Sequence, residues 1–316
     1  LTAQLQQASD GLLVWSDRYT GNLAPDQIFK IQQDIAVSVA KQLAEPFALL
    51  GELSLQRLAT NEDPSLSSYE CVLKGYEYRA TFDREKHAVA RDCLEEAVRT
   101  DPGYSRAWAL LAYIYSDEHR FFYNPQPEAY RRALDAGREA VALDPNDALS
   151  HQALSVALFS NGEIEAALES GRKAIELNPH NTEALIQVGY RTFATGRWEE
   201  GLAFAEEAIA TSLSAPPWYP WVLAIYHYKQ KDYAKARTFA EAAGLSNMVL
   251  VEATRAAIYG QLGLIDEASE SLDRVRKNDP LFDQRARQWF SVHQFPNDFL
   301  DSIMEGLRNA GVQTPD

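Results

Sequence analysis

The sequence predicts an all-α fold, a solenoid of stacked helical hairpins with a small β-hairpin and helix in front of it. Two observations lead to this prediction. Prolines recur at one fixed period, or at that period plus an insertion, and alanines precede each proline at a regular spacing. The period is about 34 residues, which is typical of repeats made of two helices.

The length and composition agree with an array. At 316 residues the chain exceeds the usual size of a single hydrophobic core, whereas a stack of repeats grows without enlarging one core. Hydrophobic residues at 46% and charged residues at 24% are typical of a folded chain. The net charge of -15 has the wrong sign for binding phosphates or anionic lipids, so we expect no direct nucleic-acid or membrane partner.

Residues 1–45 differ from the rest of the chain. Alternating apolar and polar residues in 1–7 and 12–19, around a turn at 9–11, predict a β-hairpin. Apolar residues at helical spacing predict an amphipathic helix over residues 25–43. We expect residues 46–64 to form a linker helix before the array.

The repeats occupy residues 65–280. Pro145 and Pro179 are one period apart, and Pro102 precedes Pro145 by one period and an insertion of nine. Small residues before each proline are expected where the two helices of a pair touch: Ala90, Ala97, Ala133, Ala140, Ala167 and Ala174. This pattern predicts six hairpins, each of which buries its apolar stripe only against its neighbours.

The clearest repeat has Leu154 and Leu158 on its first helix, Gly162 at the turn and Ala167 on its second helix. This pattern resembles the tetratricopeptide repeat (TPR) family, and the resemblance implies a right-handed superhelix. Residues 281–316, with Trp289 among their apolar positions, are then expected to form C-terminal capping helices.

Residues 1–45 resemble the end of a TolB-like α/β domain, on the strength of residues 4–11, 14–19 and 28–36. In bacterial signalling proteins such a domain commonly joins a TPR array to an output module. That module is a class III adenylate or guanylate cyclase, or a winged-helix DNA-binding domain. Residues 305–311 are similar to the closing helix of cyclase-linked arrays, which favours the cyclase.

The sequence carries no motif for chemistry. Its six histidines are scattered singly, and phosphate-binding glycine loops and nucleophile elbows are missing from it. We therefore expect no catalytic residue, no metal site and no cofactor. Cys71 and Cys93 are too few for a disulfide framework, and we expect both to be buried small apolar residues, with a disulfide between them as the less favoured alternative. Without a signal peptide or an apolar span, the expected location is cytoplasmic.

The remaining functional feature is the concave groove, where first-helix side chains of TPR arrays hold peptides. The repeat register places these residues there: Tyr69, Tyr76, Arg79, Arg106, Tyr113, Gln152, Phe159, Glu183, Tyr190, Phe193, Trp218, Trp221 and Tyr228. This groove is aromatic, so we expect a protein or peptide partner with an apolar anchor. The alternative for any one ring is packing between adjacent helices.

The family's carboxylate clamp is not expected, because Gln152, Glu183 and Tyr190 occupy positions where lysine and asparagine are needed. An acidic segment bound by Arg79, Arg106 and Arg191 ranks below the apolar anchor.

The inserted residues 119–127 contain three adjacent aromatic rings. We expect Phe121, Phe122 and Tyr123 to fold back on the array, with contact to a partner as the alternative.

The sequence thus predicts a noncatalytic interaction and regulatory region of a cytoplasmic bacterial signalling protein, linked to a nucleotide cyclase. The alternative is the effector region of a winged-helix transcriptional regulator. The oligomeric state is left open.

Overall fold

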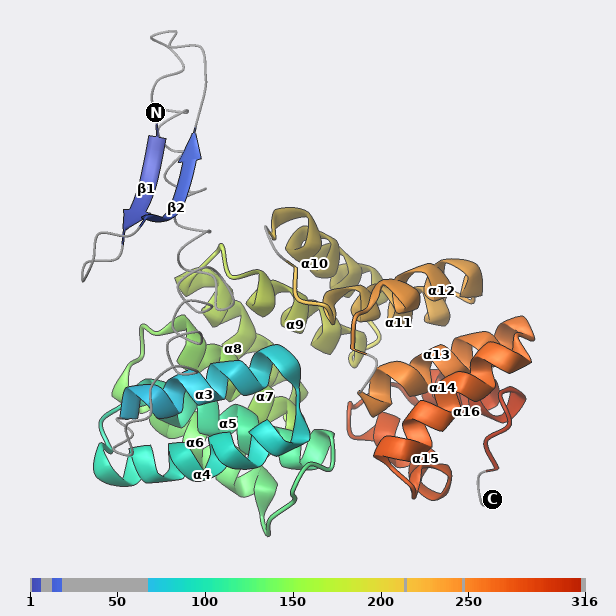
Figure 1. Ribbon diagram of the computed structural model, residues 1–316, viewed down its shortest axis with the longest axis horizontal. Coiled ribbons are helices and arrows are strands. Elements are labelled where there is room, and N and C mark those ends of the chain that lie inside the picture. Colours follow the sequence, from blue (N-terminus) through green and yellow to red (C-terminus); the bar gives the residue numbers. More distant parts are fainter. Residues whose placement is uncertain (1, 7–12, 19–67, 213–214, 246–247, 314–316) are drawn as a thin grey trace, which may run out of the picture.

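The computed structural model describes residues 2–6, 13–18, 68–212, 215–245 and 248–313. Helices dominate these residues (Figure 1). They are α3 (Ser68–Thr81), α4 (Arg84–Thr100), α5 (Ser105–Arg120), α6 (Ala129–Leu143), α7 (Ala148–Ser160), α8 (Ile164–Leu177), α9 (Thr182–Phe193), α10 (Trp198–Thr211), α11 (Tyr219–Lys229), α12 (Tyr233–Ala242), α13 (Val249–Leu262), α14 (Ile265–Asn278), α15 (Phe282–Ser291) and α16 (Asn297–Asn309).

Two short strands precede the helices. Strand β1 (Thr2–Gln6) pairs antiparallel with β2 (Leu13–Arg18), with Gln4 opposite Ser16. The predicted β-hairpin is therefore present in the described residues. The predicted helices at 25–43 and 46–64, and the turn at 9–11, lie outside the described residues.

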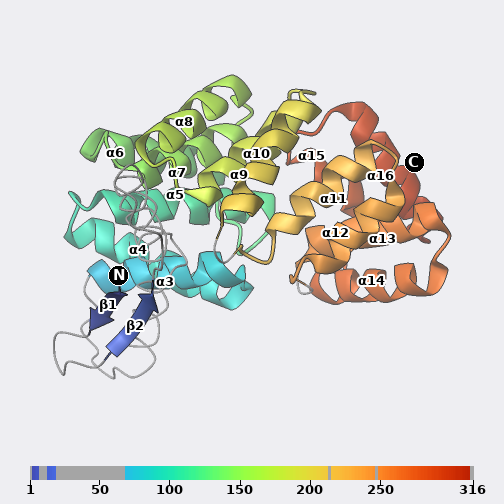
Figure 2. The same cartoon turned by 90° about the horizontal axis from the view of Figure 1, so that it is seen from above.

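Successive helices from α3 to α14 pack as hairpins, and the hairpins stack side by side (Figures 1 and 2). The predicted small residues lie where the helices approach: Ala90, Ala97, Ala133, Ala140, Ala167 and Ala174 have at most 2% of their surface exposed. A methyl side chain lets two backbones come close, which a larger residue would prevent. The predicted all-α solenoid is confirmed.

The turn between α7 and α8 depends on Gly162. Its φ is +81°, in the left-handed region where a β-carbon is unfavourable. The backbone N–H of Gly162 donates to Phe159 O at 3.0 Å, and that of Glu163 donates to Leu158 O at 2.9 Å. These bonds satisfy the last carbonyl groups of α7 and reverse the chain into α8.

The favoured expectation of two unpaired cysteines is wrong. Cys71 and Cys93 form a disulfide that joins α3 to α4. Because the two helices run antiparallel in contact, their Cα atoms at these positions are 5.2 Å apart, within the range that a disulfide requires. The small number of cysteines gave no sign of this pairing.

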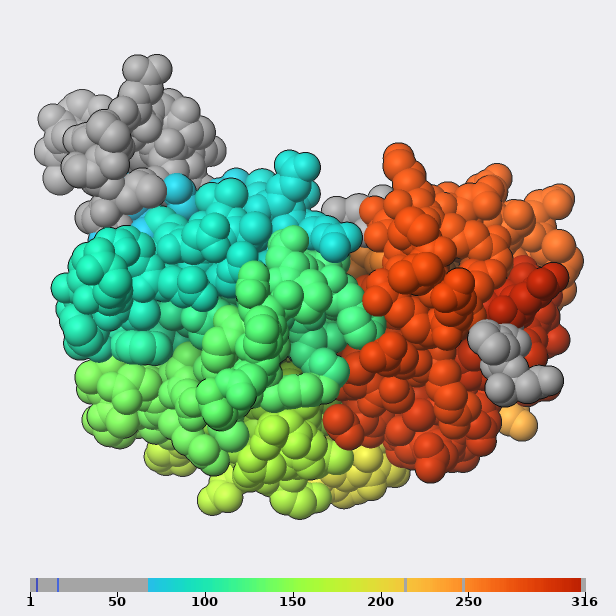
Figure 3. All heavy atoms as spheres, turned by 90° about the horizontal axis from the view of Figure 1, so that it is seen from below, coloured from blue at the N-terminus to red at the C-terminus, as the bar shows by residue number. Residues whose placement is uncertain are grey.

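The three inserted aromatic residues fold back on the protein, as predicted. Phe121 is 2% exposed and packs against Phe82, with ring centroids 5.7 Å apart. Phe122 contacts Trp289 of α15 at 4.8 Å, and Tyr123 is also buried. The loop after α5 therefore meets the C-terminal helices, as the surface in Figure 3 shows.

Helices α15 and α16, the C-terminal pair, close the array. Helix α16 packs on α13 at two glycines, Gly260 and Gly306, whose backbones are too close for a β-carbon between them. The segment between α15 and α16 then returns to the middle of the stack, where His293 packs 6.2 Å from Phe121 and 6.0 Å from Tyr190. None of the helices in the described residues is long and apolar enough to cross a membrane.

Candidate binding pocket

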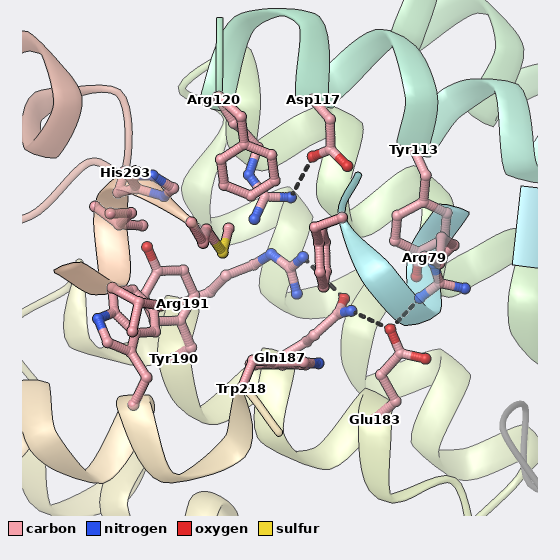
Figure 4. A pocket seen from close by; sticks show the side chains of 16 residues that line it. Arg79, Tyr113, Asp117, Arg120, Glu183, Gln187, Tyr190, Arg191, Trp218 and His293 are labelled. Carbon is pink, nitrogen blue, oxygen red and sulfur yellow. Dashed lines mark hydrogen bonds and ion pairs between the residues drawn. The ribbon is translucent and has the colours of Figure 1, made fainter. Parts of the chain in front are cut away.

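A pocket lies at the centre of the array, between the first helices of the hairpins and the returning C-terminal segment (Figure 4). We call it the central pocket. Helices α3, α5, α9, α11 and α13 line it together with His293. The centre of a water molecule can move through about 50 Å³ of it. The central pocket is therefore small, with room for a compact group and not for a folded peptide segment.

Helix α9 supplies one polar wall. Glu183, Gln187, Tyr190 and Arg191 all line the central pocket. Their spacing of four, seven and eight positions places them on one face of a helix. Asn181 caps this helix by accepting a hydrogen bond from the Ala184 N–H at 3.1 Å.

A chain of hydrogen bonds joins two arginines through α9. The Arg191 guanidinium donates to Gln187 Oε1 at 3.0 Å, and the Gln187 amide donates to Glu183 Oε1 at 2.8 Å. Arg79 of α3 donates to the same Glu183 oxygen and forms an ion pair with it. Figure 4 shows this chain along one wall of the pocket. The carboxylate of Glu183 is therefore paired with Arg79, and only the neutral Gln187 amide connects it to Arg191.

Helix α5 supplies a second ion pair. Asp117 is 2% exposed and accepts a hydrogen bond from the Tyr78 hydroxyl at 2.9 Å. Its other oxygen lies 3.2 Å from Arg120. Burial raises the pKa of Asp117, which its arginine neighbours partly offset.

Arg191 differs from the other two arginines of the central pocket. It is 3% exposed, and no carboxylate of the described residues lies within ion-pair distance of it. Burial, together with the positive charge of Arg120, lowers the pKa of Arg191 to about 10. The guanidinium stays charged at neutral pH, so the central pocket contains a buried cation that lacks a direct counter-charge.

Aromatic rings form a further part of the lining, which begins at Tyr190 of α9. Tyr190 and Trp221 have centroids 5.3 Å apart, and Tyr190 also meets Phe295 at 5.6 Å. The Trp221 indole N–H donates to Thr254 Oγ1 at 3.0 Å, which fixes the buried ring. Trp218 is only half-buried, so it is the ring of this part of the lining that a partner can reach.

The structure divides the predicted groove residues into three groups. Those that line the central pocket are Arg79, Tyr113, Glu183, Tyr190, Trp218 and Trp221. Tyr69 and Arg106 are exposed and Tyr76 is half-buried, and these three do not line it. Gln152, Phe159, Phe193 and Tyr228 are buried and also lie outside its lining.

Two residues of the last group are core residues. Phe193 has no exposed surface and stacks on Trp198 at 4.9 Å. Tyr228 is equally buried and donates a hydrogen bond to Ser302 O at 2.7 Å. Both rings pack between adjacent helices, so we remove them from the groove.

Sequence reasoning missed Asp117, Arg120 and His293. The first two follow Tyr113 by four and seven positions, so helical spacing from a predicted groove residue points to them. Nothing near His293 in the sequence indicates that it returns to the array. Among the residues that the structure describes, no three His, Cys, Asp or Glu side chains come close enough to hold a metal ion.

Comparisons with known proteins agree with the fold. The sequence profile of the tetratricopeptide repeat matches residues 128–182. No curated protein sequence matches the chain. Among solved structures, the Cut9–Hcn1 hetero-tetramer of the APC/C is 16% identical, with a TM-score of 0.55 over 86% of this chain and 48% of that one. This chain thus spans about half the length of the chain that it matches in that structure.

A TPR protein of Thermus thermophilus is also similar, at 18% identity, with a TM-score of 0.47 over 72% of this chain and 98% of that one. The profile match covers α6, α7 and α8, so these helices include a tetratricopeptide repeat. The described helices as a whole have the all-α solenoid fold of a TPR array, a fold that generally serves as a protein-binding scaffold.

Proposed function

We propose that this chain is a noncatalytic interaction and sensing region that holds a protein or peptide partner on the concave side of its TPR array. The observation that supports the proposal most is the convergence of Arg79, Tyr113, Tyr190, Trp218 and Trp221 on one pocket. Large amphipathic side chains beside buried arginines are typical of the centre of a binding surface.

The residue of this chain that anchors the partner is Trp218. It is half-buried and lines the central pocket, whereas Trp221 is 5% exposed and hydrogen-bonded to Thr254. A side chain that approaches from solvent can therefore reach the ring of Trp218, while that of Trp221 is covered and contributes to stability.

The test measures the affinity of a captured partner for three forms of the chain. Partners are captured from an extract of the source organism, identified by mass spectrometry and purified. We expect Trp218→Ala to weaken binding by about 2 kcal/mol, or about 30-fold, as removal of a central aromatic anchor does.

The matched control is Trp108→Ala. Trp108 is also half-buried, its indole N–H donates to Pro102 O at 2.9 Å, and it does not line the central pocket. We expect this variant to bind as the unchanged chain does. Equal losses in both variants, or no loss in either, would place the partner elsewhere.

For the whole protein we propose a signalling protein whose output module is a class III nucleotide cyclase. The TolB-like resemblance of residues 4–11, 14–19 and 28–36 supports this, and the same resemblance supports the alternative, a winged-helix transcriptional regulator. The coding sequence upstream of Leu1 distinguishes them. A cyclase domain there supports the first, and a winged-helix domain supports the second.

A cytoplasmic location is also part of the proposal, and the Cys71–Cys93 disulfide opposes it. Disulfides persist mainly in oxidising compartments, because cytoplasmic reductants keep thiols reduced. Thiol labelling of the protein in intact cells decides the matter. Labelled Cys71 and Cys93 support the cytoplasm, whereas two protected cysteines indicate an oxidising compartment.

A further inference from the structure

The charged groups that face the central pocket do not balance. Three arginines, Arg79, Arg120 and Arg191, line it against two carboxylates, Asp117 and Glu183. The histidine of the lining is neutral, because burial and the positive charge of Arg120 hold its pKa well below the usual range. One positive charge therefore remains in the middle of a chain whose net charge is -15.

This excess charge is localised on Arg191. Asp117 pairs with Arg120 and Glu183 pairs with Arg79, while the hydrogen-bond acceptor of Arg191 among the described residues is the neutral Gln187 amide. A buried charge without a direct counter-charge is costly, so an arrangement of this kind is expected where a ligand supplies the opposite charge.

A second observation also indicates a ligand. Several deeply buried polar atoms of the lining form no hydrogen bond with the described residues: Arg191 Nε, the Tyr190 hydroxyl and both ring nitrogens of His293. Glu183 Oε2 also lacks such a bond, but a carboxylate oxygen only accepts hydrogen bonds and does not bind an anion. Each of these side chains is at most 6% exposed. In Figure 4, Arg191, Tyr190 and His293 lie around one side of the pocket. Buried polar groups are nearly always satisfied, and the polar atoms of Arg191, Tyr190 and His293 line the same pocket.

The rest of the wall is apolar, which limits the kind of anion. Trp218, Trp221, Met248, Leu250 and Val251 line the central pocket beside the arginines. If an inorganic anion such as phosphate bound here, its polar oxygens would lie against these apolar side chains, which is unfavourable. A carboxylate with a short hydrocarbon tail pairs its charge with Arg191 and its tail with this wall.

The size of the central pocket sets the length of the tail. The 50 Å³ that a water centre can reach is about a third of an apolar cavity of about 150 Å³ that takes benzene. A ring is therefore too large, and a carboxylic acid of about two or three carbon atoms, which has fewer heavy atoms than benzene, fits better. An extended peptide also fits poorly, because the contacts of His293 with Phe121 and Tyr190 close one side.

We propose that the central pocket binds a small aliphatic carboxylate, whose charge pairs with Arg191 and whose tail lies against Trp221 and Met248. This inference rests on the proposed sensing role and names the chemical class of the signal. It is independent of the protein partner, which reaches the array at Trp218.

The test is calorimetric titration of the full chain with sodium propionate at constant ionic strength. We expect saturable binding of propionate below about 10 mM, and no binding of the neutral propionamide. Inorganic phosphate and benzoate should bind at least about tenfold more weakly than propionate.

The decisive variant is Arg191→Met, which keeps the length of the side chain and removes its charge. We expect propionate affinity to fall at least about tenfold, as loss of a charged hydrogen bond does, while the melting temperature stays equal or rises. Arg99→Met is the matched control, because Arg99 pairs with Glu96 on the exposed surface. It should bind propionate unchanged. If Arg191→Met does not fold, Arg191→Gln provides the same test.

Three results would overturn the proposal. They are the absence of saturable binding up to about 10 mM, equal binding of propionate and propionamide, and equal affinities in the Arg191 and Arg99 variants. If phosphate bound as tightly as propionate, the claim that the ligand carries a hydrocarbon tail would be overturned. None of these results bears on whether Trp218→Ala weakens binding of the protein partner. The carboxylate proposal and the partner proposal can therefore fail separately.

Discussion

Substituting Gly260 by alanine tests how the C-terminal pair closes the array. A β-carbon at this position of α13 would collide with the backbone carbonyl of Gly306 and would lie 2.7 Å from Ala310 N. Ordinary van der Waals contact begins at 3.4 Å. Because the obstructing atoms belong to backbone and not to a flexible side chain, α16 has to move away from α13.

Two effects of opposite sign set the change in the free energy of unfolding in Gly260→Ala. Alanine stabilises a helix interior by about 1 kcal/mol relative to glycine. Overpacking costs about 1–3 kcal/mol and occasionally more, and the backbone contact places this site at or above the upper end. We expect a net loss of about 2 kcal/mol, which lowers the melting temperature by about 4–8 °C in a domain of this size.

The assay is urea unfolding followed by far-UV circular dichroism and tryptophan fluorescence. Gly103→Ala is the control, since its β-carbon would meet nothing closer than Asp101 Oδ1 at 3.8 Å. We expect this control to unfold within about 0.5 kcal/mol of the unchanged chain. A Gly260→Ala chain as stable as the control would refute the close contact of α13 with α16.

Three further predictions concern other parts of the chain. Replacing Cys71 and Cys93 by serine should lower the free energy of unfolding by about 3 kcal/mol, because the cross-link spans 22 residues, and a reductant should then have no further effect on the melt. Gly162→Val should cost at least about 1 kcal/mol in a thermal melt, and Gly162→Asn less, since the open surroundings leave backbone strain at φ +81° as the cause. Burial lowers the pKa of His87 to about 4, below its unfolded value of 6.5, so stability should fall by up to about 1.4 kcal/mol per pH unit from pH 6.5 to pH 4. Urea titrations across this range should show a smaller fall in His87→Gln, and an identical fall would contradict the assignment.

The repeating part of the fold was predictable because its determinants are local. Each hairpin carries its own alanines at the helix contact, such as Ala167 and Ala174, and its own turn glycine, such as Gly162. The same register placed Tyr190 and Trp221 on the inner helices, and both line the central pocket.

The parts that sequence reasoning missed depend on contacts between distant residues. His293 reaches Tyr190 from a remote part of the chain, and periodicity within a repeat carries no information on such a return. The Cys71–Cys93 disulfide depends on which faces of α3 and α4 meet. Phe193 lies on a groove helix but faces Trp198, because one helix presents some side chains inward and others to its partner.

The central claim is that partners bind at the middle of the concave side, beside Trp218. Photo-crosslinking in cells tests it most directly, with benzoylphenylalanine at Trp218 in one form of the chain and at Tyr130 in another. Tyr130 is 39% exposed on α6 and does not line the central pocket. We predict a crosslinked partner from position 218 and none from position 130. A partner crosslinked from position 130, with none from position 218, would contradict the claim.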